Sequence, residues 1–222
     1  MSTLNTHFTP IDQSSWERRD YFYYFTQMAP TGFSLTANLD VTATQAWAKT
    51  HHRKFNAIYL YLVSRILTQH PEMRIGRVND QLVTFDVIHP SYTIIHADHT
   101  MANLWTAYDD NFDTFYHRYL ADLADYGQVP GPMPKTPLAT NLYPIGSLPW
   151  LHFTNYTPLP FTPLKTFFPV FQAGQFTFDD QGQCQLPLSV TIHHAVADGY
   201  HVSMLFHDLQ AAFNRPDQLL SA

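Results

Sequence analysis

Two adjacent histidines, His193 and His194, followed by Asp198 form the strongest chemical pattern in this sequence. Apolar side chains in the segment 186–192 alternate at the two-residue period of a half-buried strand, so the histidines come at the end of that strand. Asp198 is of a type that caps helices, and residues 202–213 repeat apolar side chains at helical spacing. Because an imidazole suits proton transfer near neutrality, the pattern suggests a general base at this turn.

A structural interpretation of the same histidines stands beside the catalytic one. Both imidazoles could close the strand and bond only to backbone groups. The spacing lets Asp198 turn back into the start of the helix instead of touching an imidazole, and the apolar strand implies a setting with little water. The residues alone leave both interpretations open.

The elements that must position this turn are predicted from periodicity and from turn residues. Helices are expected over 43–52 with Thr42 as cap, from a cap at Asn56 to before Pro71, and from Leu104 to Gly127. Extended segments are expected over 82–88, 92–96, 150–156, 175–178 and 185–192. Helices interspersed among strands predict an α/β fold with a mixed sheet and helices packed on one side, as one domain over 1–222.

Composition narrows the class of protein. The chain has 222 residues, 45% of them apolar, which is enough for a large core. A formal net charge of −6 with only 12 lysines and arginines argues against nucleic-acid binding. Cys184 is the single cysteine, so no disulfide framework is expected, and a reducing cytoplasm fits. The polar first ten residues and the lack of a run of 18 apolar residues predict a protein that is neither exported nor in a membrane.

The thirteen histidines raise the question of a metal site. His51 with His52, and His96 with His99, could supply nitrogen ligands. Neither pair has a third histidine and a carboxylate in a recognisable zinc pattern, so no metal is expected.

The segment from His193 to His201 resembles the HHxxxDG signature of the trimeric, CoA-dependent chloramphenicol acetyltransferases, which other CoA-dependent acyltransferases share in shorter form. The resemblance continues over Ile11 to Arg19, His89 to Thr93 and Leu148 to Trp150, in the family's order and nearly its spacing. It therefore covers almost the whole chain. It implies a two-layer α/β sandwich of the CoA-dependent acyltransferase type.

The resemblance also implies a reaction and its residues. His194 would be the general base for direct transfer of an acetyl group from acetyl-CoA to a hydroxyl of chloramphenicol or a similar small molecule, without an acyl-enzyme. His193 would be structural. Asp198 would pair with Arg18 to hold the geometry of the turn, with an exposed arginine and a plain helix cap as the alternative.

Binding residues follow from the same resemblance. CoA would lie near Lys54, Trp150, Gln175 and Phe176, where Gln175 replaces a lysine and Phe176 a tyrosine. The acceptor pocket would lie at the interface of a homotrimer, facing the histidine of a neighbouring subunit. Apolar surface in Tyr21 to Phe25 and in the segment 156–168 favours such an interface. The pocket positions are Tyr24, Phe25, Thr93, Met101, Tyr156 and Val170.

One position departs from the family pattern. Gly146 stands four residues before Trp150, where the family carries a serine whose hydroxyl stabilises the oxyanion. Loss of one such donor can lower turnover about 10²–10³-fold, unless another group substitutes. Gly146 therefore supports an alternative function, a non-catalytic or weakly active trimeric relative that binds an apolar small ligand.

Overall fold

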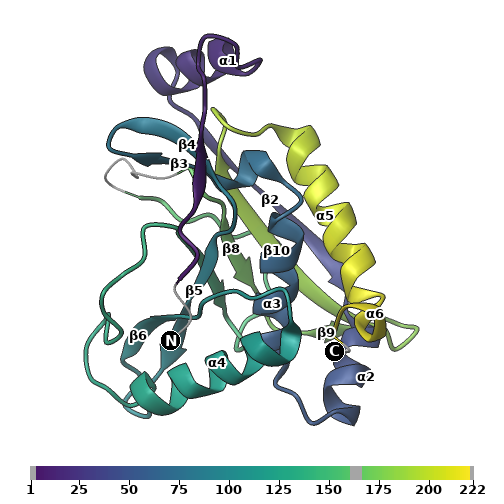
Figure 1. Cartoon of the computed structure of the whole chain (residues 1–222). Coiled ribbons are helices and arrows are strands. Elements are labelled where there is room, and N and C mark those ends of the chain that lie inside the picture. The colour runs from purple at the N-terminus through teal and green to yellow at the C-terminus, as the bar shows by residue number, and fades with distance from the viewer. Residues whose placement is uncertain (1–3, 161–166, 221–222) are drawn as a thin grey trace.

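A long central strand organises the main sheet of this computed structural model, which describes residues 4–160 and 167–220. The described residues form a seven-stranded sheet in the order β2-β10-β8-β7-β5-β6, and β9 also pairs with β10 (Figure 1). Strand β7 runs parallel to β5 and β8, whereas the other pairs are antiparallel, so the sheet is mixed as predicted. Its strands are β2 (Gly32–Asp40), β5 (His89–Ile95), β6 (Met101–Trp105), β7 (Leu142–Ser147), β8 (Val170–Ala173), β9 (Thr177–Phe178) and β10 (Cys184–His193).

Helices pack against this sheet and form the second layer. Helix α3 contacts α5, α2 and α4, and the layer reaches the sheet through contacts of α3 with β5, α5 with β2 and α2 with β10 (Figure 1). Most of α3 is buried, which explains why its sequence is apolar on nearly every side. The helices are α2 (Thr42–Thr50), α3 (Phe55–Leu67), α4 (Phe112–Tyr126), α5 (Gly199–Phe213) and α6 (Pro216–Leu220).

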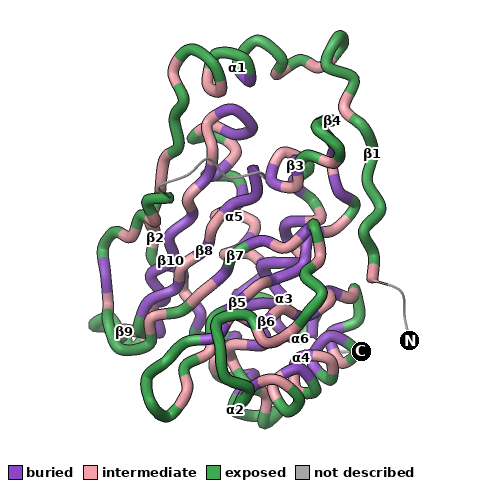
Figure 2. Tube along the Cα trace, turned by 90° about the vertical axis from the view of Figure 1, so that its left-hand side faces the viewer, coloured by how far each residue is buried: buried purple, intermediate pink, exposed green. Residues whose placement is uncertain are grey.

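The N-terminal segment runs along the molecule and reaches one end of it (Figure 1). A small sheet of β1 (Phe8–Pro10), β4 (Gln81–Phe85) and β3 (Ile75–Val78) fixes the start of the chain, and β3 follows a 3-10 turn over Pro71–Arg74. Helix α1 (Arg19–Tyr23) then continues into a π-helical turn, Tyr24–Met28. Figure 2 shows this end as largely exposed backbone and the central strands as buried.

The predicted helix from Leu104 to Gly127 is wrong in its first part. Leu104 lies in β6, and α4 begins only after Asn111, whose side chain accepts a hydrogen bond from the backbone N–H of Thr114. Leu104 and Tyr108 are both buried, one in a strand and one in a loop, so their helical spacing from Phe112 is a coincidence.

Other differences concern caps and strands. Val41 and Lys54 take the N-cap positions expected for Thr42 and Asn56, and neither cap makes a side-chain hydrogen bond. Strands β2, β7 and β8 were not predicted, and the segment 150–156 is irregular rather than a strand. The organisation of residues 1–222 as one domain stays a prediction.

Candidate active site

The turn between β10 and α5 holds the residues singled out by the sequence. Asp198 caps α5, because its Oδ1 accepts a hydrogen bond from the backbone N–H of Tyr200 at 3.1 Å. The Nδ1 atom of His201 lies 2.8 Å from the same oxygen. The predicted role of Asp198 as an N-cap is therefore confirmed, and its carboxylate is not free to orient a catalytic imidazole.

Arg18 reaches this turn from the residue before α1. Its Nη1 lies 3.2 Å from Oδ2 of Asp198, its Nη2 donates to the carbonyl of His194 at 3.0 Å, and its Nε donates to the carbonyl of Ala195 at 2.9 Å. The Arg18 side chain is 15% exposed and that of Asp198 is 38% exposed. Burial acts to raise the pKa of Asp198, but hydrogen bonds from His201 and Arg18 outweigh it and hold that pKa below its usual value. One guanidinium thus contacts three residues of the turn.

The His194 ring lies between two aromatic side chains. It stacks on Phe25 with ring centroids 4.0 Å apart and an interplanar angle of 7°, and the Phe33 ring is tilted at 5.0 Å. The backbone N–H of His194 donates to the carbonyl of Thr31 at 2.9 Å. Its Nδ1 is buried and has no hydrogen-bond partner among the described residues. Aromatic packing, and not a carboxylate, therefore orients this imidazole.

His193 has a different environment. Its Nδ1 accepts a hydrogen bond from the backbone N–H of Ala195 at 3.1 Å, and its ring meets the edge of Phe167 at 5.3 Å. Burial, with the nearby imidazole of His194, lowers the pKa of His193 and favours the neutral ring. The backbone partner matches the structural interpretation for this histidine.

The acceptor-pocket positions fall into two groups. Tyr24 and Phe25 lie in the π-helical turn, with their rings 5.0 Å apart, and Phe25 contacts His194. Thr93 and Met101 lie on the β5–β6 hairpin, near the opposite edge of the sheet from β10.

The Phe25 ring stacks on His194 of its own chain, and the expected contact of the acceptor pocket with the histidine of a neighbouring subunit stays a prediction. The unpredicted pairing of β2 with β10 places Phe25 there, because it sets Gly32 opposite His193 and brings the preceding turn to the histidine.

Val170 and Tyr156 lie between these two groups. Val170 pairs with Thr191 of β10, and the Tyr156 carbonyl accepts a hydrogen bond from Ser189 of β10 at 2.6 Å. In the segment 156–168, residues 161–166 lie outside the described part of the chain.

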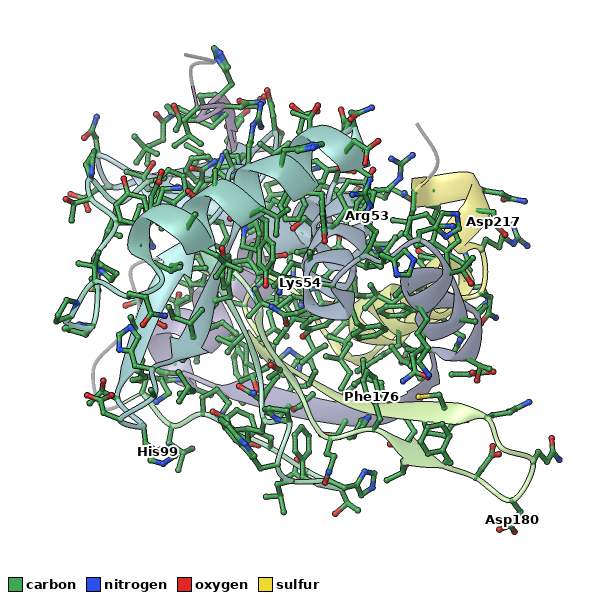
Figure 3. The ribbon with its side chains drawn as sticks, turned by 90° about the horizontal axis from the view of Figure 1, so that it is seen from below. Arg53, Lys54, His99, Phe176, Asp180 and Asp217 are labelled. Atoms are coloured by element: carbon green, nitrogen blue, oxygen red, sulfur yellow. The ribbon has the colours of Figure 1, made fainter. Side chains whose placement is uncertain are left out.

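The positions expected to bind CoA lie near one another. Lys54 is exposed at the start of α3, and the next residue, Phe55, meets the ring of Phe176 edge-on at 4.8 Å. Figure 3 shows Lys54 and Phe176 in the same region of the lower side of the molecule. The backbone N–H of Gln175 donates to the carbonyl of Leu151 at 2.9 Å, which ties this segment to the exposed Trp150.

Gly146 lies in β7 directly beside Gln172 of β8. A Cβ atom on residue 146 would stand 2.8 Å from one end of the Gln172 amide. Ser147, the neighbouring hydroxyl, is exposed at the end of β7. No sequence signal marked Gln172, because the pairing of β7 with β8 was not predicted.

Two further features concern the ranges 4–160 and 167–220. No group of three or more histidine, cysteine, aspartate or glutamate side chains in these ranges could hold a metal ion. No helix in them is both long and apolar enough to cross a membrane.

Sequence comparison finds relatives that cover nearly the full chain. The family described as chloramphenicol acetyltransferase matches residues 6–210. A chloramphenicol acetyltransferase of Clostridium perfringens is 34% identical over 205 residues, 91% of this chain and 93% of that protein. One of Bacillus pumilus is 32% identical over 215 residues, 96% of this chain and 97% of that protein.

Solved structures share the fold. A chloramphenicol acetyltransferase superposes with a TM-score of 0.78 at 24% identity and covers 92% of this chain and 99% of its own. The truncated catalytic core of a 2-oxoacid dehydrogenase complex from Thermoplasma acidophilum gives 0.67 at 15% identity and covers 98% of this chain and 100% of its own. These likenesses confirm the predicted α/β fold with its mixed sheet.

Proposed function

This chain belongs to the chloramphenicol acetyltransferase family, and from that premise we propose that it transfers the acetyl group of acetyl-CoA to a hydroxyl of chloramphenicol or of a similar small molecule. The observation that carries the proposal is the turn 193–198, where Arg18 fixes the backbone of His194 while Phe25 and Phe33 hold its ring. A turn braced in this way presents one imidazole in one orientation, as a general base requires.

His194 acts as general base in this proposal. It takes the proton of the acceptor hydroxyl as the hydroxyl oxygen bonds to the thioester carbonyl carbon, whose carbonyl oxygen becomes an oxyanion. When the carbon–sulfur bond breaks, the thiolate leaves and receives that proton from the imidazolium. The products are the acetyl ester and free CoA thiol. Asp198 and Arg18 touch neither substrate and act by positioning the turn.

A thiol-release assay with acetyl-CoA and chloramphenicol tests the function directly. We expect CoA thiol to appear at a rate that depends on chloramphenicol and saturates with it. Release that does not depend on chloramphenicol, or no release, would count against this acceptor. A panel of other hydroxylated small molecules then separates a different acceptor from a protein that lacks transferase activity.

We assign the CoA-binding role to the surface formed by Lys54, Trp150, Gln175 and Phe176. The exposed ammonium of Lys54 suits the phosphates of CoA, and the rings of Trp150 and Phe176 offer packing for its apolar and aromatic parts. The close contact of Phe55 with Phe176 fixes the distance between the start of α3 and the segment before β9.

Lys54→Ala is expected to raise the KM for acetyl-CoA about two- to fivefold with kcat unchanged, because an exposed charge contact is worth about 0.2–1 kcal/mol. Gln175→Lys restores a second positive charge and is expected to lower the same KM by a similar factor. Steady-state kinetics with acetyl-CoA as the varied substrate measures both. An unchanged KM in both variants would remove these residues from the CoA site.

We further propose a homotrimer in which each active site is shared between two subunits. Two observations support it. The Thr93 and Met101 hairpin is separated from β10 by β8 and β7, so about 14 Å of sheet lies between this part of the acceptor pocket and β10 of the same chain. Several other large apolar side chains are also exposed, which is typical of an interface: Tyr21, Tyr23, Tyr24, Met28, Leu151 and Leu159. A neighbouring subunit would bring its hairpin to His194.

Subunit mixing tests the shared site. One variant carries His194→Ala and the other Met101→Glu, which places a charge in the pocket without touching the Phe25–His194 stack. If subunits exchange at random, about a quarter of the sites combine an intact base with an intact pocket, so about a quarter of the wild-type rate should return. No recovery under conditions where exchange is demonstrated, or a monomer in sedimentation at micromolar concentration, would contradict the shared site.

A further inference from the structure

The side chain of Gln172 fills the space beside Gly146, between strands β7 and β8. The two residues are direct partners in the parallel pair β7–β8, and a Cβ on residue 146 would meet the Gln172 amide at 2.8, 3.2 and 3.3 Å. Real Cβ atoms do not approach heavy atoms to 2.8 Å, so the Gln172 side chain can lie here only because residue 146 is glycine. A side chain on residue 146 would therefore displace the Gln172 amide from this position.

The orientation of the Gln172 amide follows from its backbone partners. In the orientation that satisfies both amide atoms, its oxygen accepts hydrogen bonds from the backbone N–H groups of Ser147 at 3.1 Å and Leu148 at 3.3 Å. The NH₂ group then faces the space that a side chain on residue 146 would fill. The half-buried amide is thus anchored through its oxygen, and its NH₂ group lies on the side of residue 146.

Gln172 lies on the same side of the sheet as two residues assigned to the acceptor pocket. Val170 is two residues earlier in β8, and side chains at this spacing share a face of the sheet. Ser189 lies directly opposite Gln172 in β10 and donates its hydroxyl to the carbonyl of Tyr156. The amide is therefore on the face of the sheet where the acceptor would bind. Ser189 is five residues before His194, about 17 Å along β10, so in the proposed shared site Gln172 would act together with His194 of a neighbouring subunit.

We propose that the side-chain amide of Gln172 is a catalytic hydrogen-bond donor to the oxyanion of acetyl transfer, in the place left open by Gly146. The inference rests on the proposed function and deepens it. As the acceptor oxygen bonds to the thioester carbon, the carbonyl electron pair moves onto oxygen, and the N–H group of Gln172 stabilises that negative charge. When the carbon–sulfur bond breaks, the charge leaves with the thiolate and the carbonyl re-forms.

The Gln172 amide is held in place before the oxyanion forms, so it is a preorganised donor. A donor fixed before the reaction needs no reorganisation as charge develops, which is why one such donor is worth about 10²–10³-fold in turnover. The Gln172 oxygen is held by backbone N–H groups, so its nitrogen is directed without help from substrate. Because the oxyanion exists only in the transition state and intermediate, removal of the donor should act on kcat more than on KM.

Gln172→Glu separates this role from a merely structural one. Glutamate has nearly the same shape and still accepts from Ser147 and Leu148, but its carboxylate has no N–H donor and opposes an oxyanion. We expect kcat to fall at least about 100-fold, with both KM values within about threefold and the midpoint of thermal unfolding nearly unchanged. A kcat within threefold of the wild type would overturn the proposal.

Gly146→Ser provides the second arm, alone and together with Gln172→Ala. Alone it is expected to lower kcat, because the new Cβ displaces the Gln172 amide. Combined with Gln172→Ala it has room, and its hydroxyl should bring kcat to at least tenfold above that of Gln172→Ala alone. A double variant no faster than Gln172→Ala would overturn the idea that the two side chains serve one position.

The wild-type rate in the same thiol-release assay distinguishes failure of the proposed function from failure of the proposed role of Gln172. A wild-type protein that releases no CoA with any acceptor would overturn the proposed function, and the role of Gln172 with it. An active wild type with an equally active Gln172→Glu variant would overturn the role of Gln172 alone.

Discussion

His194→Ala is expected to lower the kcat of acetyl transfer about 10⁴-fold, the upper end of what a general base contributes. The variant loses the only imidazole that the braced turn presents between Phe25 and Phe33, and His193 cannot replace it because its Nδ1 already accepts from the backbone N–H of Ala195. Thiol release under saturating acetyl-CoA and chloramphenicol measures the loss.

His207→Ala is the matched control for this prediction. His207 is an exposed imidazole on α5, and its Nδ1 lies 3.4 Å from Oδ1 of the neighbouring Asp208. Its removal should leave kcat within about twofold of the wild type, and both variants should keep the same oligomeric state. Retention of more than a few per cent of turnover by a folded His194→Ala protein would rule out the general-base assignment.

The catalytic turn could be predicted from the sequence because the signals that mark the turn are local. Alternation over 186–192 predicts the end of β10 at the histidines, and Asp198 predicts the start of α5; the structure bears out both within a residue. Contact between Arg18 and Asp198, 180 positions apart, followed from the family resemblance and not from spacing. Family patterns record contacts that periodicity cannot indicate.

Residues that depend on strand pairing could not be predicted in the same way. The stack of Phe25 on His194 requires β2 to lie against β10, and the approach of Gln172 to Gly146 requires β7 to lie against β8. Neither β2, β7 nor β8 was predicted, and no local pattern states which strands become neighbours. For the same reason the sequence showed the missing serine at Gly146 but not the side chain that fills its place.

The apolar residues between 102 and 112 fit both the alternation of a strand and the spacing of a helix. Leu104, Tyr108 and Phe112 fit a helix, but buried Ala102, Leu104 and Thr106 also fit a strand that continues into a buried loop. Pairing of β6 with β5 decides between the two, because it gives residues 101–105 cross-strand partners at the edge of the sheet. A tertiary contact thus overrode the local pattern.

Arg18→Met is expected to cost both stability and activity, because one guanidinium holds Asp198, the carbonyl of His194 and the carbonyl of Ala195. Asp198 is 38% exposed, so the cost should fall below the 3–5 kcal/mol of a fully buried pair, at about 2 kcal/mol or a fall of about 4–8 °C in the unfolding midpoint. The turn then no longer fixes the backbone of His194, and a misplacement of 1 Å can lower kcat about 100-fold.

Arg19→Met is the control that distinguishes the contacts of Arg18 with the turn from a general effect of removing positive charge at α1. Arg19 is the next residue, its side chain is 55% exposed, and its ion pair is with the adjacent Asp20, which is 84% exposed. Exposed pairs of this kind contribute about 0–1 kcal/mol, so Arg19→Met should leave both the unfolding midpoint and kcat close to the wild type. Calorimetry and thiol release on the two variants measure the difference, and equal effects would show that Arg18 does not position the catalytic turn. A loss of stability in Arg18→Met with full kcat would limit its role to folding, because a base that keeps its rate does not depend on the contacts that this arginine makes with the turn.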